Sequence, residues 1–128
     1  MIYLDTSVAL AQLFAEDRLP PEDLWLKPLT ASRLLQYEVW NRVNARRLAA
    51  THGDGVRELL NGVIYVELAP PILARALQPF PVPVRTLDAL HLATLEFLHG
   101  RGQPIELASY DARLVAAARS LSLPILTL

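Results

Sequence analysis

The sequence opens with a short apolar run at residues 2–4 that ends in an acid and two hydroxyls, Asp5, Thr6 and Ser7. Apolar residues then recur at helical spacing over residues 8–15, which predicts a helix. A strand that runs directly into a helix delivers Asp5 to the carboxyl end of the strand. In an open parallel sheet, ligands bind beyond that edge. The question for the rest of the chain is therefore which other side chains reach the same edge.

Strand-like and helix-like segments alternate along the whole chain, with no internal repeat and no low-complexity linker. The strand segments are apolar throughout, which favours a parallel sheet covered on both faces. We therefore predict a single α/β domain over residues 1–128, with three α/β/α layers and a central, mostly parallel sheet. Further strands are predicted at 28–31, 63–68, 105–109 and 124–128, and further helices at 33–49, 56–60, 72–77, 87–99 and 111–121, with a break at 53–55.

The composition limits the kinds of protein this can be. With 52% hydrophobic and 20% charged residues, the chain is expected to be folded, and a net charge of −1 means that nucleic-acid binding would need a local basic patch. The absence of cysteine excludes disulfides and thiolate metal sites and fits a cytoplasmic protein. No apolar run is long enough to cross a bilayer, so no membrane association is expected.

Four acids are candidates for one site. Asp5 and Asp111 follow predicted strands, and Asp88 opens the helix after a proline-rich connector at 79–83. Each of these three could instead cap a helix. Glu38 lies inside a predicted helix, where capping does not apply, and its alternative role is a weak i,i+4 pair with Arg42.

Four carboxylates at one edge would repel one another and raise each other's pKa. A divalent cation relieves that repulsion, and oxygen ligands without a His or Cys cluster suit Mg²⁺ or Mn²⁺. Such ions polarise phosphoryl oxygens and activate water for in-line attack. The acids therefore predict phosphodiester hydrolysis.

The ordered set of motifs resembles the PIN domain, and most closely the VapC ribonuclease toxins of prokaryotic toxin–antitoxin pairs. The matching segments are Tyr3-Leu4-Asp5-Thr6-Ser7, Glu38 within a helix, Asp88-Ala89-Leu90-His91-Leu92-Ala93-Thr94, and Ser109-Tyr110-Asp111-Ala112-Arg113-Leu114. The resemblance implies a metal-dependent endoribonuclease in which all four acids form the catalytic metal site. It also implies an RNA substrate, a homodimer and a cognate VapB-type antitoxin that covers the active-site groove. Ser109 stands where the family often has threonine, which keeps a hydroxyl.

Other polar residues near these motifs have two interpretations each. The Thr6 and Ser109 hydroxyls could steady a scissile phosphate or cap helices. Arg42 could hold Glu38 or bind an RNA phosphate. His91, alone in an apolar helix, is expected to be packed and hydrogen-bonded rather than catalytic.

Two alternatives to the ribonuclease remain. One is a non-catalytic PIN-like RNA-binding module of a larger complex, against which the intact acids argue. The other is a response-regulator-like switch domain. That class needs a lysine near its acid pocket, and the only lysine, Lys27, lies in the early proline-flanked segment.

Overall fold

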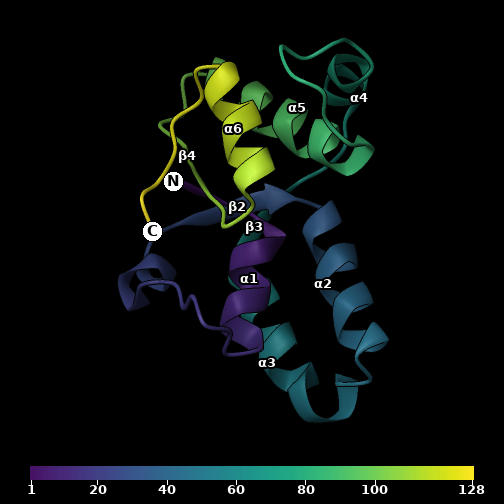
Figure 1. Cartoon of the computed structure of the whole chain (residues 1–128), viewed down its shortest axis with the longest axis vertical. Helices are drawn as coiled ribbons and strands as arrows, with labels where there is room; N and C mark the ends of the chain where they lie inside the picture. Colours follow the sequence, from purple (N-terminus) through teal and green to yellow (C-terminus); the bar gives the residue numbers. More distant parts are fainter.

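The computed structural model describes residues 1–128 and is built on a four-stranded parallel sheet (Figure 1). The sheet order is β3-β2-β1-β4, and every neighbouring pair is parallel. Tyr3 of β1 aligns with Thr30 of β2 on one side and with Leu107 of β4 on the other. The first strand is therefore central, as the predicted parallel α/β fold requires. The strands are β1 (Ile2–Leu4), β2 (Leu29–Ser32), β3 (Val63–Val66) and β4 (Glu106–Ala108).

Six helices cover the sheet in two groups. In Figure 1, α1, α2 and α3 lie below the sheet and α4, α5 and α6 lie above it. Their bounds are α1 (Thr6–Leu13), α2 (Leu34–Ala45), α3 (Ala49–Asn61), α4 (Pro70–Ala76), α5 (Thr86–Gly100) and α6 (Ala112–Ser120), with a 3₁₀ turn at Glu22–Leu26. None of these helices combines the length and apolar character needed to cross a bilayer.

The central strand serves two hydrophobic cores. Ile2 and Leu4 pack into the core that α1, α2 and α3 complete, whereas Tyr3 packs into the core of α5 and α6. Successive side chains of a strand point to opposite faces, so an all-apolar strand needs a cover on each side. This is the physical reason for the three-layer α/β/α arrangement.

The predicted single helix over 33–49 is wrong, because the chain turns at residues 46–48. Arg47 adopts a left-handed conformation with φ of 55°. Its N–H bonds to the Asn44 carbonyl at 3.0 Å, and the Leu48 N–H bonds to the Val43 carbonyl at 3.0 Å. This is the pattern of a Schellman C-cap, a position that glycine usually occupies. An arginine there gives no sequence signal for a helix end.

Two further helices end in the same way without glycine. Ala15 and Ser122, with φ of 48° and 57°, follow the last turns of α1 and α6. Conversely, the break predicted at 53–55 is wrong, because Gly53 and Gly55 lie inside the continuous helix α3. Glycine follows the ends of α3 and α5, at Gly62 and Gly102, whereas three other helix stops use other residues.

The predicted strand at 124–128 is mostly absent. The segment makes one isolated parallel bridge, between Ile125 and Leu107 of β4. The Leu107 N–H bonds to the Pro124 carbonyl at 2.9 Å, and the Leu126 N–H bonds to the Leu107 carbonyl at 2.9 Å. Pro124 has no N–H, so the ladder cannot extend to the residues before this bridge.

Candidate active site

Asp5 lies at the carboxyl end of the central strand and is 7% exposed. Its Oδ2 atom accepts hydrogen bonds from the Ser7 hydroxyl at 2.6 Å, the Ser109 hydroxyl at 2.8 Å and the Ser7 N–H at 3.4 Å. Asp5 is thus the N-cap of α1, as the capping interpretation predicts. Its Oδ1 atom accepts no hydrogen bond from the protein and is not among the buried unpaired atoms. One carboxylate oxygen therefore remains open at the sheet edge.

Two serines join the β1–α1 junction to the β4–α6 junction. The Ser7 hydroxyl accepts a hydrogen bond from the Tyr110 N–H at 2.9 Å, and the Ser109 hydroxyl accepts one from the Asp111 N–H at 3.0 Å. These bonds hold Asp5 and Asp111 on the same edge although they are far apart in sequence. Ser109 was a predicted site residue, whereas Ser7 was not. Its place two residues after Asp5, the spacing of an Asx turn, is the signal that could have identified it.

Asp111 and Asp88 differ in how they are held. Asp111 is the N-cap of α6, and its Oδ1 atom accepts from the N–H groups of Arg113 at 2.9 Å and Leu114 at 3.3 Å. The N-cap of α5 is Arg85, and the Asp88 carboxylate makes no hydrogen bond within the protein. Helix capping therefore uses only one carboxylate oxygen of Asp111, and Asp88 is not a helix cap at all.

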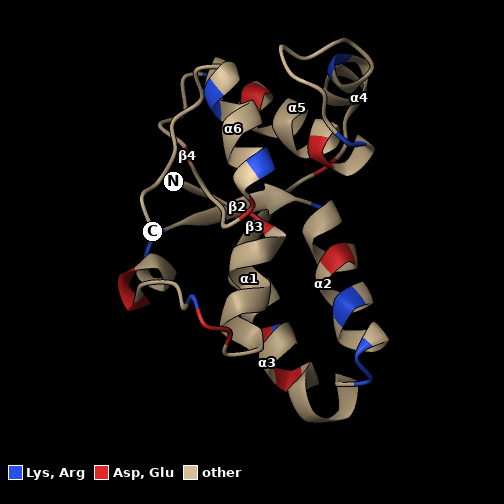
Figure 2. Ribbon diagram, viewed as in Figure 1, with Lys and Arg blue, Asp and Glu red and all other residues tan.

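Three of the predicted acids act electrostatically on the fourth, Asp88. Partial burial raises the pKa of the Asp88 carboxyl, and the negative charges of Asp111, Asp5 and Glu38 raise it further, against an opposing effect of His91. Figure 2 shows acidic segments where α1 meets α5 and α6 and another on α2, while Lys and Arg are spread over several elements. The acids thus belong to one negatively charged edge.

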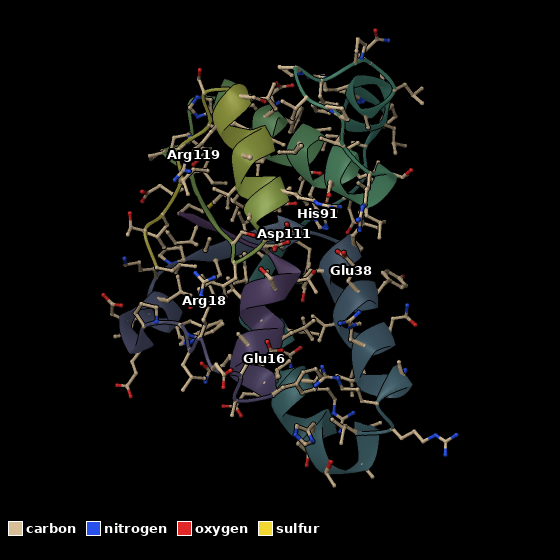
Figure 3. All side chains as sticks on the ribbon, in the orientation of Figure 1. Glu16, Arg18, Glu38, His91, Asp111 and Arg119 are labelled. Atoms are coloured by element: carbon tan, nitrogen blue, oxygen red, sulfur yellow. The ribbon has the colours of Figure 1, made fainter.

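Glu38 does not pair with Arg42. Its Oε1 atom lies 2.5 Å from Nε2 of His91, and Figure 3 shows the two side chains meeting between α2 and α5. Arg42 has no carboxylate within salt-bridge distance. The alternative i,i+4 interpretation of Glu38 is therefore wrong, and the expectation that His91 is packed and hydrogen-bonded is confirmed.

His91 is the middle of a buried chain of hydrogen bonds that ends on Glu38. The Ser32 N–H donates to the Tyr3 hydroxyl at 3.2 Å, which lies 2.9 Å from Nδ1 of His91. Tyr3 is 1% exposed and His91 2% exposed. Burial lowers the pKa of His91, but the hydrogen bond and charge of Glu38, with the charges of Asp5 and Asp88, outweigh it and raise the pKa above its ordinary value. Sequence reasoning missed Tyr3 and Ser32 because their partners come from other elements.

The free oxygen atoms at this edge are the kind of ligand that a hard divalent cation prefers. The open Oδ1 atom of Asp5, the Oδ2 atom of Asp111 that the cap leaves free and the unpaired Asp88 carboxylate are all oxygen ligands. The Thr6 hydroxyl is buried beside Asp5 without a hydrogen-bond partner. As the side chains stand, no three acidic or imidazole groups gather closely enough to share one ion. A shared ion would therefore require side-chain rotation, for which Asp88 is free.

Comparison with known proteins agrees with the motif order. The PIN domain profile matches residues 2–120. Ribonuclease VapC47 of Mycobacterium tuberculosis (strain CDC 1551 / Oshkosh) is 29% identical over 131 residues, an alignment that covers 94% of this chain and 92% of the relative. The match spans all four strands and every predicted acid. The chain belongs to the PIN domain family.

Proposed function

We propose that this protein is a Mg²⁺- or Mn²⁺-dependent endoribonuclease and the toxin of a toxin–antitoxin pair. The observation that carries the proposal is the arrangement around Asp5. Ser7 and Ser109 both bind its Oδ2 atom, which leaves Oδ1 open beside Asp111 at the carboxyl edge of the sheet. A carboxylate fixed by hydroxyls on one oxygen and open on the other is preorganised to bind a cation.

Asp5, Asp88, Asp111 and Glu38 would hold the ion in this proposal. A bound Mg²⁺ or Mn²⁺ would polarise a phosphoryl oxygen and lower the pKa of the attacking water. Asp5 supplies the rigid contact, because two serines fix it. Asp88 supplies the adjustable one, since it has no hydrogen bond to lose, and ion binding would remove the repulsion that raises its pKa.

The Glu38 carboxylate would be oriented by a hydrogen bond from a buried residue on the side away from the ion. Its Oε1 atom is held by His91, and the second oxygen is left to face the other acids or a bound water. Thr6 would orient substrate or water only after its buried, unpaired hydroxyl rotates toward the acidic edge. Ser109 would act through Asp5 rather than on substrate, because its hydroxyl is occupied by Asp5 and Asp111.

The choice of RNA as substrate is supported by the relative, which is named a ribonuclease. Its name also supports a cognate antitoxin of the VapB type as the partner of this chain. A neutralising partner would cover the acidic edge with cations, because that edge carries uncompensated negative charge in the isolated chain.

The test is cleavage of single-stranded RNA by purified protein with Mg²⁺ or Mn²⁺ and with a chelator. Asp5→Asn and Asp88→Asn are expected to lose at least about a hundredfold in rate, as for loss of a ligand and charge at a metal site. Asp54→Asn is the matched control, because Asp54 is an exposed acid of α3 paired only with Arg57. The proposal fails if all three variants cleave as fast as the parent. RNA binding without cation binding would instead favour the non-catalytic module.

We also propose that two copies associate through the face formed by α4, the 79–83 connector and the start of α5. This face holds an apolar groove of about 850 Å³. Leu77, 85% exposed, lines this groove, and Leu73, which also lines it, is 42% exposed. Light scattering should report a dimer that Leu77→Glu dissociates, and a monomeric parent at micromolar concentration would reject the proposal.

A further inference from the structure

A second cavity, of about 600 Å³, lies against the face of α1 that carries Ser7, next to the acidic edge. Its floor is Ser7, Leu10 and Ala11, which share one face of the helix because they are spaced by three and four residues. Arg18 and Arg42 line it from the neighbouring segments, together with Tyr110, Glu16 and Asp17. A volume of this size is within the range of small-ligand sites and accommodates one nucleotide.

The cavity is continuous with the candidate active site through two residues. The Ser7 hydroxyl that lines it also binds Asp5 at 2.6 Å. Tyr110 stands between Ser109 and Asp111 in sequence, and its N–H bonds to Ser7. A chain whose phosphate lay at Asp5 and Asp111 would therefore place an adjacent nucleotide over α1.

Arg18 and Tyr110 form a flat, partly exposed surface in this cavity. The Arg18 guanidinium carbon lies 4.3 Å from the centre of the Tyr110 ring. Although Glu16 and Asp17 precede Arg18, it forms no salt bridge, so its planar group is free to stack. Figure 3 shows Glu16 and Arg18 beside α1, with Arg18 on the opposite side of that helix from Glu38. Proteins bind unpaired bases by stacking them on aromatic rings and guanidinium planes.

The charges of the cavity suit a base more than a second phosphate. Two arginines and two acids make its lining close to neutral overall. Arg42 has no salt-bridge partner, lines the cavity and lies one helical turn after Glu38, so it suits the linking phosphate. Glu16 and Asp17 would repel a further phosphate but can accept hydrogen bonds from base N–H groups.

We propose that this cavity is the subsite for one unpaired nucleobase of RNA flanking the scissile phosphate, with Arg18 and Tyr110 as the stacking surface and Arg42 on the phosphate. The proposal names the substrate contacts of the ribonuclease proposed above and so rests on that function. It adds Arg18, which neither the acids nor the motifs include, and gives Tyr110 a contact with a base.

The experiment measures binding of a short single-stranded RNA by fluorescence anisotropy in chelator, so that no cleavage occurs. Arg18→Ala and Tyr110→Leu are each expected to weaken binding roughly five- to a hundredfold, the range for losing one base stack. Arg101→Ala is the matched control, because Arg101 also lies over an aromatic ring, that of Phe97, but at the far end of α5. Its affinity should equal that of the parent.

Two comparisons separate stacking from charge alone. Arg18→Lys keeps the charge without the plane and should bind as weakly as Arg18→Ala, whereas full recovery with Lys would overturn the stacking surface. In a series of oligonucleotides, each lacks the base at one position. At one of these positions the parent and Arg18→Ala should bind equally, because the base that stacks on Arg18 is missing there. If Arg18→Ala matches the parent on intact RNA, or if its loss is the same with every abasic oligonucleotide, the subsite is rejected.

The outcome is distinguishable from failure of the proposed function. Binding is measured without metal. If the protein does not cleave RNA but its affinity still depends on Arg18 and on one base, the subsite proposal stands and the ribonuclease proposal fails. If cleavage depends on Asp5 but neither cleavage nor binding depends on Arg18, the ribonuclease proposal stands and the subsite proposal fails.

Discussion

The hydrogen-bond chain behind Glu38 makes a prediction that can be tested without RNA or metal. Tyr3→Phe removes one oxygen from the centre of the protein and leaves the ring in place. That oxygen accepts from the Ser32 N–H at 3.2 Å and contacts Nδ1 of His91 at 2.9 Å. Both partners are buried, with Ser32 0% and His91 2% exposed. Two buried polar groups therefore lose a partner at once.

The expected cost follows from those two groups. A buried donor or acceptor left unpaired costs about 1–3 kcal/mol, and some of this is offset because the variant no longer buries a hydroxyl. We expect Tyr3→Phe to lower the free energy of unfolding by about 2–4 kcal/mol. For a domain of this length, 1 kcal/mol shifts Tm by about 4 °C, so Tm should fall by about 8–16 °C.

The assay is urea unfolding followed by fluorescence and circular dichroism, with thermal melts in the same metal-free buffer. Tyr37→Phe is the unaffected control, because Tyr37 is 68% exposed. Tyr65→Phe is the intermediate control, because its hydroxyl makes one bond, to the Leu60 carbonyl at 2.8 Å. A loss below about 0.5 kcal/mol for Tyr3→Phe, the range of an ordinary surface substitution, would refute the reasoning.

Three further predictions concern charge and backbone. Asp88→Asn should raise Tm in metal-free buffer, because burial and the nearby acids raise the pKa of Asp88 and so make its ionised form destabilising. The gain in Tm should be present at neutral pH and vanish as the pH falls below 3.8, the ordinary pKa of the group. A lower Tm for the variant would contradict this prediction. Because the pKa of His91 is raised in the folded protein, its stabilising contribution is complete below pH 6.5 and is lost as the pH rises through the folded-state pKa. Urea melts at a series of pH values should show the free energy of unfolding fall over this range in the parent and change less with pH in His91→Gln. Gly55→Ala should stabilise the protein by about 0.5–1 kcal/mol in thermal melts, because Gly55 is inside α3 and an added Cβ would meet only Leu13 at 3.9 Å, an ordinary contact. Equal or lower stability of Gly55→Ala would show that the position resists a side chain for another reason.

The placement of the acids could be predicted to different degrees. Asp5 and Asp111 each follow an apolar strand, and carboxyl ends of parallel strands share an edge, so sequence alone places them together. Asp88 was a candidate cap until the structure showed the helix beginning two residues earlier. Glu38 was recognised as an acid that capping cannot explain, and the only partner that local spacing offered for it was Arg42. The actual partner, His91, is 53 residues away, a separation at which local spacing carries no information.

Helix ends were the weakest part of the prediction for a related reason. A Schellman cap is defined by backbone conformation and two hydrogen bonds, and Arg47 adopts it here at the position where glycine is common. The cost of a left-handed arginine, about 1 kcal/mol, is small beside the packing of α2 and α3. Tertiary contacts therefore decided where the helix stops, and the glycines inside α3 were overruled in the same way.

The sequence by itself determined the class of fold and the edge at which the chemistry is concentrated. Apolar strands alternating with helices must be covered on both faces, and an acid directly after such a strand must stand at its carboxyl end. Only the tertiary structure decided which oxygen of Asp5 is open, that Glu38 is held by His91, and that Arg18 and Tyr110 meet beside the acids. Those relations depend on atoms brought within a few ångströms from distant segments, and the spacing of residues along a chain does not encode such distances.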